Sequence, residues 1–125
     1  MKEIMAVIRM NMVGKTKEAL LKTGNPAVTC LKVLGRGKQK VNFSMIEDYV
    51  PELANEKISE EISEIHRLVS KRLLIILVKD EDVKNIINII IETNKTGSPG
   101  DGKIFVTNVA DTIKIRTGET GEQAI

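Results

Sequence analysis

Two glycine-rich stretches of the chain carry lysines, and these residue types together can bind anionic oxygens. The first, Gly35–Lys40, reads GRGKQK, and the second, Gly97–Lys103, reads GSPGDGK. Glycine lets backbone N–H groups approach a phosphate or carboxylate closely, and lysine adds positive charge. Ordinary turns have the same composition, so neither stretch alone establishes an anion site.

The second stretch has the spacing of a phosphate-binding P-loop but lacks its context. Gly97–Lys103 satisfies the pattern G-x-x-x-x-G-K, yet Ile104 follows where Ser or Thr should hold magnesium. The next residues, Ile104-Phe105-Val106, favour a strand, whereas a P-loop leads into the N-terminus of a helix. The sequence therefore excludes a P-loop ATPase and leaves open a phosphate-binding loop of another architecture.

Residues for acid–base, covalent or metal chemistry are few. His66 is the only histidine and Cys30 the only cysteine, so the chain offers zinc a poor ligand set. Because free cysteine is among the most buried residue types, we expect Cys30 in the core. We expect His66 on a solvated helix surface rather than in the role of a general base. The sequence thus offers no catalytic residue, and we do not expect an enzyme.

Length and composition indicate a single domain over residues 1–125. The net charge is +2, from 19 basic and 17 acidic residues without a long block of one sign, so nucleic-acid binding is not indicated. No apolar run approaches the roughly 20 residues that span a bilayer. We therefore expect a cytoplasmic protein without stable membrane insertion.

Hydrophobic periodicity divides the chain into strands and two helices. Amphipathic spacing predicts helices at Val13–Thr23, stopped by Gly24, and at Val83–Ile91. Apolar or β-branched runs predict strands at Ile4–Ile8, Ala27–Leu34, Arg72–Val78 and Lys103–Val109, with a short last strand at Thr112–Arg116.

The resulting order, β-α-β-β-α-β, is the ferredoxin-like plan of the α+β class. Two helices then cover one face of an antiparallel sheet. The other face is left bare, and a small domain usually covers such a face with copies of itself. The sequence therefore predicts an oligomer.

A long connection, Gly37–Ser70, joins two strands that should pair. Loops longer than roughly 15 residues are usually functional or disordered. Within it, Ile58, Ile62, Ile65 and Val69 recur at helical spacing among acidic residues. This pattern predicts a short amphipathic helix, which either binds a partner through its apolar side or packs permanently on its own domain.

Several motifs, in order along the chain, resemble the PII nitrogen regulatory family. The most specific is Gly100–Val106 (GDGKIFV) followed by Ile115–Glu122 (IRTGETGE). Met1–Ile4 (MKEI), Lys17–Leu20 (KEAL) and Gly35–Lys40 also match. The resemblance covers nearly the whole chain apart from the middle of the long connection.

The resemblance implies a βαββαβ trimer that binds ATP or ADP between subunits and senses 2-oxoglutarate. The long connection, about residues 37–70, would be the T-loop that contacts the target protein. Nucleotide-binding residues would be Thr29, Gly35, Gly37, Lys38, Gln39, Gly100, Asp101, Gly102, Lys103, Phe105, Lys114 and Arg116, the last of these from a neighbouring subunit. Residues for 2-oxoglutarate would be Gln39, Lys40 and Lys71; Gln39 would reach Mg²⁺ on ATP, and Ile58, Ile62 and Ile65 would contact the partner.

Departures from the family pattern indicate a branch. Lys114 stands where most members have a second arginine, which keeps the charge but loses the bidentate fork. Tyr49 lies in the T-loop in surroundings unlike the site of uridylylation in bacterial members, and Arg9-Met10-Asn11-Met12 replaces the usual Lys-Pro-Phe. With its long T-loop, the chain resembles the nitrogenase-associated archaeal PII proteins, specifically the longer of two paralogues that work together.

That resemblance implies inhibition of nitrogenase when ammonium is plentiful, relieved by 2-oxoglutarate. A paralogue would be a possible partner in a hetero-oligomer. A second hypothesis is a PII protein for another target, such as an ammonium transporter or an enzyme of nitrogen metabolism. Because a transporter plug needs a slim loop, a T-loop with an extra amphipathic helix favours a broad protein surface and the first hypothesis.

Overall fold

The computed structural model describes residues 1–25, 27–37 and 68–125. One-turn 3₁₀ helices precede both long helices, at Met10–Met12 and Asp80–Asp82, and another lies at Gly121–Ala124. The main elements are β1 (Lys2–Arg9), α1 (Val13–Leu21), β2 (Thr29–Gly35), β3 (Val69–Val78), α4 (Val83–Asn94) and β4 (Lys103–Asn108). This order confirms the predicted alternation of strands and helices.

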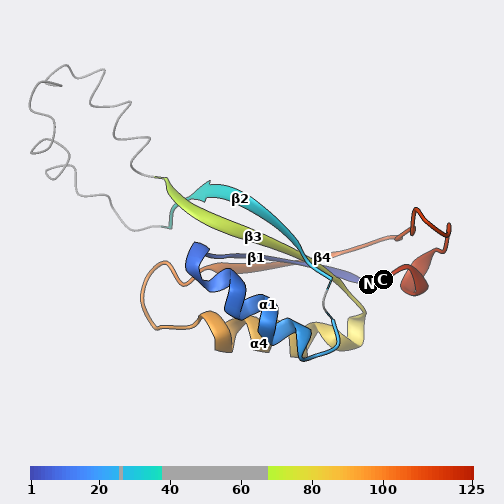
Figure 1. Cartoon of the computed structure of the whole chain (residues 1–125), viewed down its shortest axis with the longest axis horizontal. Coiled ribbons are helices and arrows are strands. Elements are labelled where there is room, and N and C mark those ends of the chain that lie inside the picture. Colours follow the sequence, from blue (N-terminus) through green and yellow to red (C-terminus); the bar gives the residue numbers. More distant parts are fainter. Residues whose placement is uncertain (26, 38–67) are drawn as a thin grey trace, which may run out of the picture.

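The four strands form one antiparallel sheet in the order β2-β3-β1-β4, and both long helices lie on the same face of it (Figure 1). The central strand β3 pairs with β1 along the whole length of β1, from Lys2 opposite Val78 to Arg9 opposite Lys71. The ferredoxin-like α+β fold predicted from the sequence is therefore confirmed.

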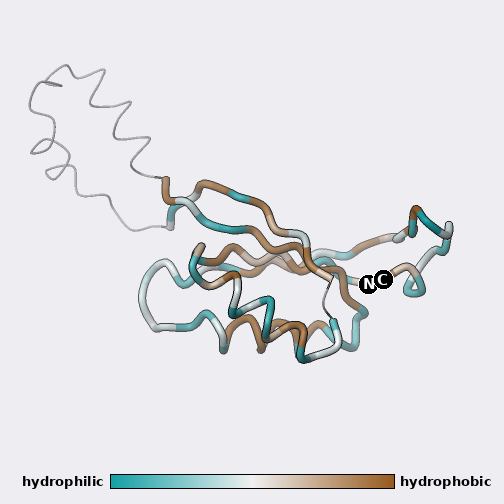
Figure 2. Tube along the Cα trace, viewed as in Figure 1, coloured by the Kyte–Doolittle hydropathy of each residue, from teal (hydrophilic) through white to brown (hydrophobic). Residues whose placement is uncertain are grey.

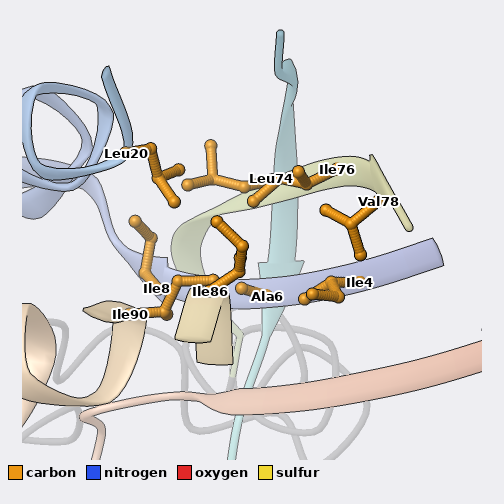
Figure 3. Packing of buried hydrophobic residues seen from close by; sticks show 9 residues of the cluster. All are labelled: Ile4, Ala6, Ile8, Leu20, Leu74, Ile76, Val78, Ile86 and Ile90. Atoms are coloured by element: carbon orange, nitrogen blue, oxygen red, sulfur yellow. The ribbon is translucent and has the colours of Figure 1, made fainter. Parts of the chain in front are cut away.

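The core lies between the helices and one face of the sheet (Figure 3). Burial alternates along β1 and the second half of β3, as a strand with one covered face requires. Burying each of these aliphatic side chains stabilises the fold by roughly 1.5–3 kcal/mol. The nine buried apolar residues are Ile4, Ala6, Ile8, Leu20, Leu74, Ile76, Val78, Ile86 and Ile90.

The middle of the opposite face of the sheet is apolar, and no helix of the described residues covers it. Met5 lies opposite both Ile75 on β3 and Phe105 on β4, and Leu31 lies opposite Leu73. Leu31 and Phe105 are each 47% exposed in the single chain. Apolar segments follow the strands in Figure 2, whereas the connecting loops are more polar. The expected bare face is present, and the oligomer that would cover it stays a prediction.

Two expectations about local structure are wrong. Cys30 is exposed and not in the core, because it lies on the edge strand β2, where Thr29 to Lys32 are all exposed. The short last strand predicted at Thr112–Arg116 is only an isolated bridge between Ile113 and Thr120. In addition, β3 begins at Val69, earlier than predicted, because Val69 still pairs with Gly35 of β2.

Candidate anion-binding site

Three basic side chains project from the uncovered face at one end of the sheet. Arg9 on β1 lies directly opposite Lys71 on β3, and Lys103 on β4 lies opposite Val7, two residues before Arg9. Directly paired residues of antiparallel strands, and residues two apart on one strand, point to the same face. The strand register thus brings three cations together at one end of the sheet.

The connection between α4 and β4, residues 95–102, is fastened to two of these cations; we call it the glycine loop. The Lys71 ammonium donates to the carbonyl of Gly100 over 3.0 Å. Arg9 donates through Nη2 to the carbonyl of Pro99 over 3.1 Å, and through Nη1 to Asp101 Oδ1 over 2.7 Å. The glycine loop is therefore held at the end of the sheet by side chains of β1 and β3.

Asp101 organises the glycine loop from within. Its carboxylate accepts hydrogen bonds from the backbone N–H of Thr96 (2.8 Å) and Gly97 (3.0 Å), and from the Thr96 hydroxyl. The Thr96 bonds and the bond from Arg9 hold the pKa of the Asp101 carboxyl well below its usual range. The negative charge is thus compensated inside the loop and need not repel a bound anion.

Two glycines let the loop backbone approach the sheet. Gly102 has a φ of +123°, and a Cβ there would lie 2.0 Å from the carbonyl oxygen of Val7. At Gly100, with a φ of +94°, a Cβ would lie 3.4 Å from Arg9 Nη2 and 3.6 Å from Lys71 Nζ. No other residue fits Gly102, and a side chain at Gly100 would crowd the space beside both cations.

A hollow of about 390 Å³ lies between α4 and β4 and is lined in part by the glycine loop. Its apolar walls include isoleucines of α4 together with Ile104 and Val106 of β4. Asp101, Gly102 and Lys103 also line the hollow, whereas Arg9 and Lys71 do not. The hollow therefore borders the cluster of cations at Lys103.

The structure brings together part of the predicted set of site residues. Gly100, Asp101, Gly102, Lys103 and Lys71 meet at one end of the sheet, with Phe105 further along β4 on the same face as Lys103. Asp101 binds the loop itself and Arg9. Arg9 was not among the site residues predicted from the sequence. The feature that could have identified it is a basic residue at the end of β1, on the same side of the strand as Val7.

Lys114 and Arg116 lie apart from this cluster. They follow the far end of β4, a strand that spans roughly 20 Å, and Figure 1 shows their segment and the glycine loop at opposite ends of the sheet. Gly35, which pairs with Val69, ends β2 at the same end of the sheet as Lys71, whereas Thr29 begins β2 at the other end. Gly37 follows β2. Outside the described residues lie Lys38, Gln39, Lys40, Ile58, Ile62 and Ile65.

Within the described ranges, no three His, Cys, Asp or Glu residues are grouped to hold a metal. The helices of those same ranges are too short or too polar to cross a membrane.

Comparison with known proteins agrees with the geometry. The sequence profile described as "Nitrogen regulatory protein P-II" matches residues 1–119. The chain is 49% identical to "Nitrogen fixation nifHD region GlnB-like protein 2" of Methanothermococcus thermolithotrophicus, over all of this chain and 98% of that protein. It is 44% identical to "Nitrogen fixation nifHD1 region GlnB-like protein 2" of Methanosarcina barkeri, over all of this chain and 99% of that protein.

A more distant relative is "Nitrogen regulatory protein P-II" of Porphyra purpurea, 39% identical over the full length of both chains. The comparisons confirm the resemblance to PII proteins and to their nitrogen-fixation-associated branch. The chain therefore belongs to the nitrogen regulatory protein P-II family.

Proposed function

We propose that this protein signals nitrogen status by binding ATP or ADP with Mg²⁺ and 2-oxoglutarate, and by regulating a partner through its T-loop. The observation that carries the proposal is the cluster of Arg9, Lys71 and Lys103 beside the glycine loop. Asp101 balances one of the three positive charges, and polyphosphate or dicarboxylate ligands can supply further negative charge through charge-assisted hydrogen bonds.

The roles divide between the two sides of the cluster. The glycine loop and Lys103 would hold the nucleotide phosphates, because Gly100 and Gly102 let a phosphate approach the loop backbone closely, next to the Lys103 ammonium. Lys71 and Arg9 would hold a 2-oxoglutarate carboxylate, with Gln39 reaching Mg²⁺. Lys71 lies two residues after Val69, where β3 begins, so a ligand on Lys71 lies at one root of the T-loop. Contacts made in only one loop arrangement would bias the loop towards it.

A second copy would complete the nucleotide site. Lys114 and Arg116 lie beyond the far end of β4 and cannot reach the glycine loop of their own chain. A head-to-tail contact in which one chain gives the loop and the next gives these cations closes naturally into a ring. The uncovered sheet face supplies apolar area for that contact. We propose a homotrimer, in which a PII paralogue could replace a subunit.

The proposed output is inhibition of nitrogenase when ammonium is sufficient. Support comes from the relatives whose names place them in a nitrogen fixation nifHD region. The apolar stripe of Ile58, Ile62 and Ile65, seen in the sequence pattern, is the proposed contact with the partner. The protein would act by binding and not by catalysis.

Calorimetry tests the ligand site. Wild-type protein should bind Mg-ATP, and 2-oxoglutarate only when Mg-ATP is present. Lys71→Ala should lose the 2-oxoglutarate response, whereas Lys32→Ala, which removes an exposed lysine on neighbouring β2, should keep it. Equal 2-oxoglutarate affinity in the two variants would refute the assignment of Lys71.

Extract from nitrogen-fixing cells tests the output. The immobilised protein should retain nitrogenase without 2-oxoglutarate and release it when 2-oxoglutarate and Mg-ATP are added. Ile62→Asp should keep ligand binding and lose the partner, because a carboxylate is costly to bury in an apolar contact. Retention of an ammonium transporter in place of nitrogenase would identify the alternative target.

A further inference from the structure

Two polar residues are buried between the helices. Thr16 of α1 is fully buried and Asn94, the last residue of α4, is 5% exposed. Asn94 Nδ2 donates to Thr16 Oγ1 over 3.1 Å and to the carbonyl of Ile90 over 2.9 Å. The Thr16 hydroxyl donates to the carbonyl of Met12 over 2.7 Å. A chain of hydrogen bonds thus crosses the interface between α1 and α4.

This chain of bonds joins the two segments that carry the glycine loop. Met12 ends the one-turn helix that starts directly after Arg9. Asn94 comes two residues before Thr96, where Asp101 fastens the start of the loop. Asp101 in turn accepts from Arg9. Hydrogen bonds and short stretches of chain therefore link these residues in a closed ring. One side of the ring connects Arg9 to Asn94 through Asp101 and Thr96. The other side connects Asn94 back to Arg9 through Thr16 and Met12.

Packing alone does not account for this pair. Asn94 Oδ1 is buried and has no hydrogen-bond donor among the described residues. An unpaired buried acceptor destabilises a fold, and replacing both members of a polar pair by apolar groups of similar shape is often neutral or stabilising. A valine and a leucine would fill the space without that penalty. The polar pair must therefore contribute something that apolar packing would not.

We propose that Thr16 and Asn94 are positioning residues for the anion-binding site. Their hydrogen bond fixes the end of α4 from which the glycine loop departs, relative to the segment that follows Arg9. Removing it loosens the loop and lowers the affinity for the anion, even where the core remains stable. This role rests on the proposed function of the site, but the order of the loop can be measured without a ligand.

The experiment compares two threonines. Thr16→Val removes a hydroxyl that bonds the carbonyl four residues back and also accepts from Asn94. Thr93→Val is the matched control, because the Thr93 hydroxyl donates over 2.7 Å to the carbonyl of Ile89, four residues back in the same helix. A third variant combines Thr16→Val with Asn94→Leu and removes the polar pair entirely. Calorimetry gives affinities for Mg-ATP and 2-oxoglutarate, and urea unfolding gives stability.

We expect Thr16→Val to weaken ligand binding about 2- to 10-fold, as for the loss of one neutral hydrogen bond, and Thr93→Val to leave it unchanged. The apolar pair should regain the stability that Thr16→Val loses but not the affinity. Without ligand, amide hydrogen exchange at Thr96 and Gly97 should be faster in Thr16→Val and in the apolar pair. These two amides donate to Asp101 and so report the order of the loop.

If the apolar pair recovers affinity and amide protection along with stability, the polar pair is only structural and the proposal is wrong. The same holds if Thr16→Val and Thr93→Val behave alike in both measurements. Should wild-type protein bind neither ligand, the proposed function fails, and the exchange of Thr96 and Gly97 still decides whether the pair orders the loop.

Discussion

The proposed site draws on two regions, the glycine loop and the C-terminal arm (residues 109–125), and these regions differ in what holds them in place. The loop is bonded to Arg9 and Lys71 of its own sheet. The arm, apart from its root at Val109, folds mainly on itself: Lys114 N–H donates to Glu119 O over 2.9 Å, and their side chains form an ion pair of 3.3 Å. Ile115 between the two arm cations is fully exposed.

This difference shows which half of the site one chain can build. The loop is already ordered against its cations, so binding needs little further ordering there. The arm has a defined shape but presents Ile115 and Arg116 to solvent, which suits a surface on another molecule. The next experiments test this division between the loop and the arm.

The largest effect is expected at Gly102. Gly102→Ala places a methyl group 2.0 Å from the Val7 carbonyl oxygen, so β1 or the glycine loop must move. The backbone conformation alone costs roughly 1–3 kcal/mol. We expect a clear fall in the free energy of urea unfolding and loss of ATP binding. Gly118→Ala in the arm is the control, since its added Cβ meets no atom within 4 Å and should destabilise less.

A mixing experiment tests whether the two regions act across subunits. Lys103→Ala and Arg116→Ala should each weaken ATP binding by on the order of 1.5–3 kcal/mol, the loss of one charge-assisted bond. Trimers refolded from both variants would contain interfaces that combine an intact loop with an intact arm. Calorimetry should then detect a fraction of wild-type sites. If mixing restores no tight site, the arm does not serve a neighbour's loop.

The smallest effect concerns acid stability. Because hydrogen bonds from Thr96 and Arg9 lower the pKa of Asp101 from its ordinary value of 3.8, the ionised carboxylate stabilises the fold above that pH. The contribution is lost as the pH falls below 3.8 towards the folded-state pKa. Asp101→Asn lacks it, so the stabilities of the two proteins should differ most above about pH 5 and converge in acid.

Urea unfolding from pH 6 down to strongly acidic buffer measures this convergence, and solvent screening keeps the difference small. A constant difference at every pH would show that the Asp101 charge has no part in stabilising the loop. Thr96→Val should lose less stability above about pH 5 than Asp101→Asn and should likewise converge with wild type in acid. The reason is that the hydrogen bond from the Thr96 hydroxyl contributes most to the lowered pKa of Asp101.

The fold was predictable because burial follows the periodicity of the sequence. Ile86 and Ile90 recur at helical spacing on α4, and the continuous apolar run Ile4–Ile8 marks β1 as a strand, although it does not show which of its residues face the core. Cys30 was mispredicted because apolar character does not reveal that β2 lies at the sheet edge. The polar start of β3 was missed because its only signal is pairing with β2, a long-range contact.

The site residues were predictable only where they belong to, or align with, the motifs of the family. Gly100–Lys103 and Lys71 could be identified from the sequence, whereas Arg9 enters the site through strand register and through its bond to Asp101. The Thr16–Asn94 bond joins residues 78 positions apart, so local periodicity could not predict it.

The pairing of Gly35 with Val69 has a consequence for how the family diversifies. The ladder between β2 and β3 holds the two ends of the intervening segment, residues 36–68, at adjacent positions. Each doubling in the length of a flexible loop with fixed ends costs only about 0.6 kcal/mol. The length and sequence of this segment can therefore change between P-II proteins at little cost in stability, while the core between the sheet and the helices stays intact.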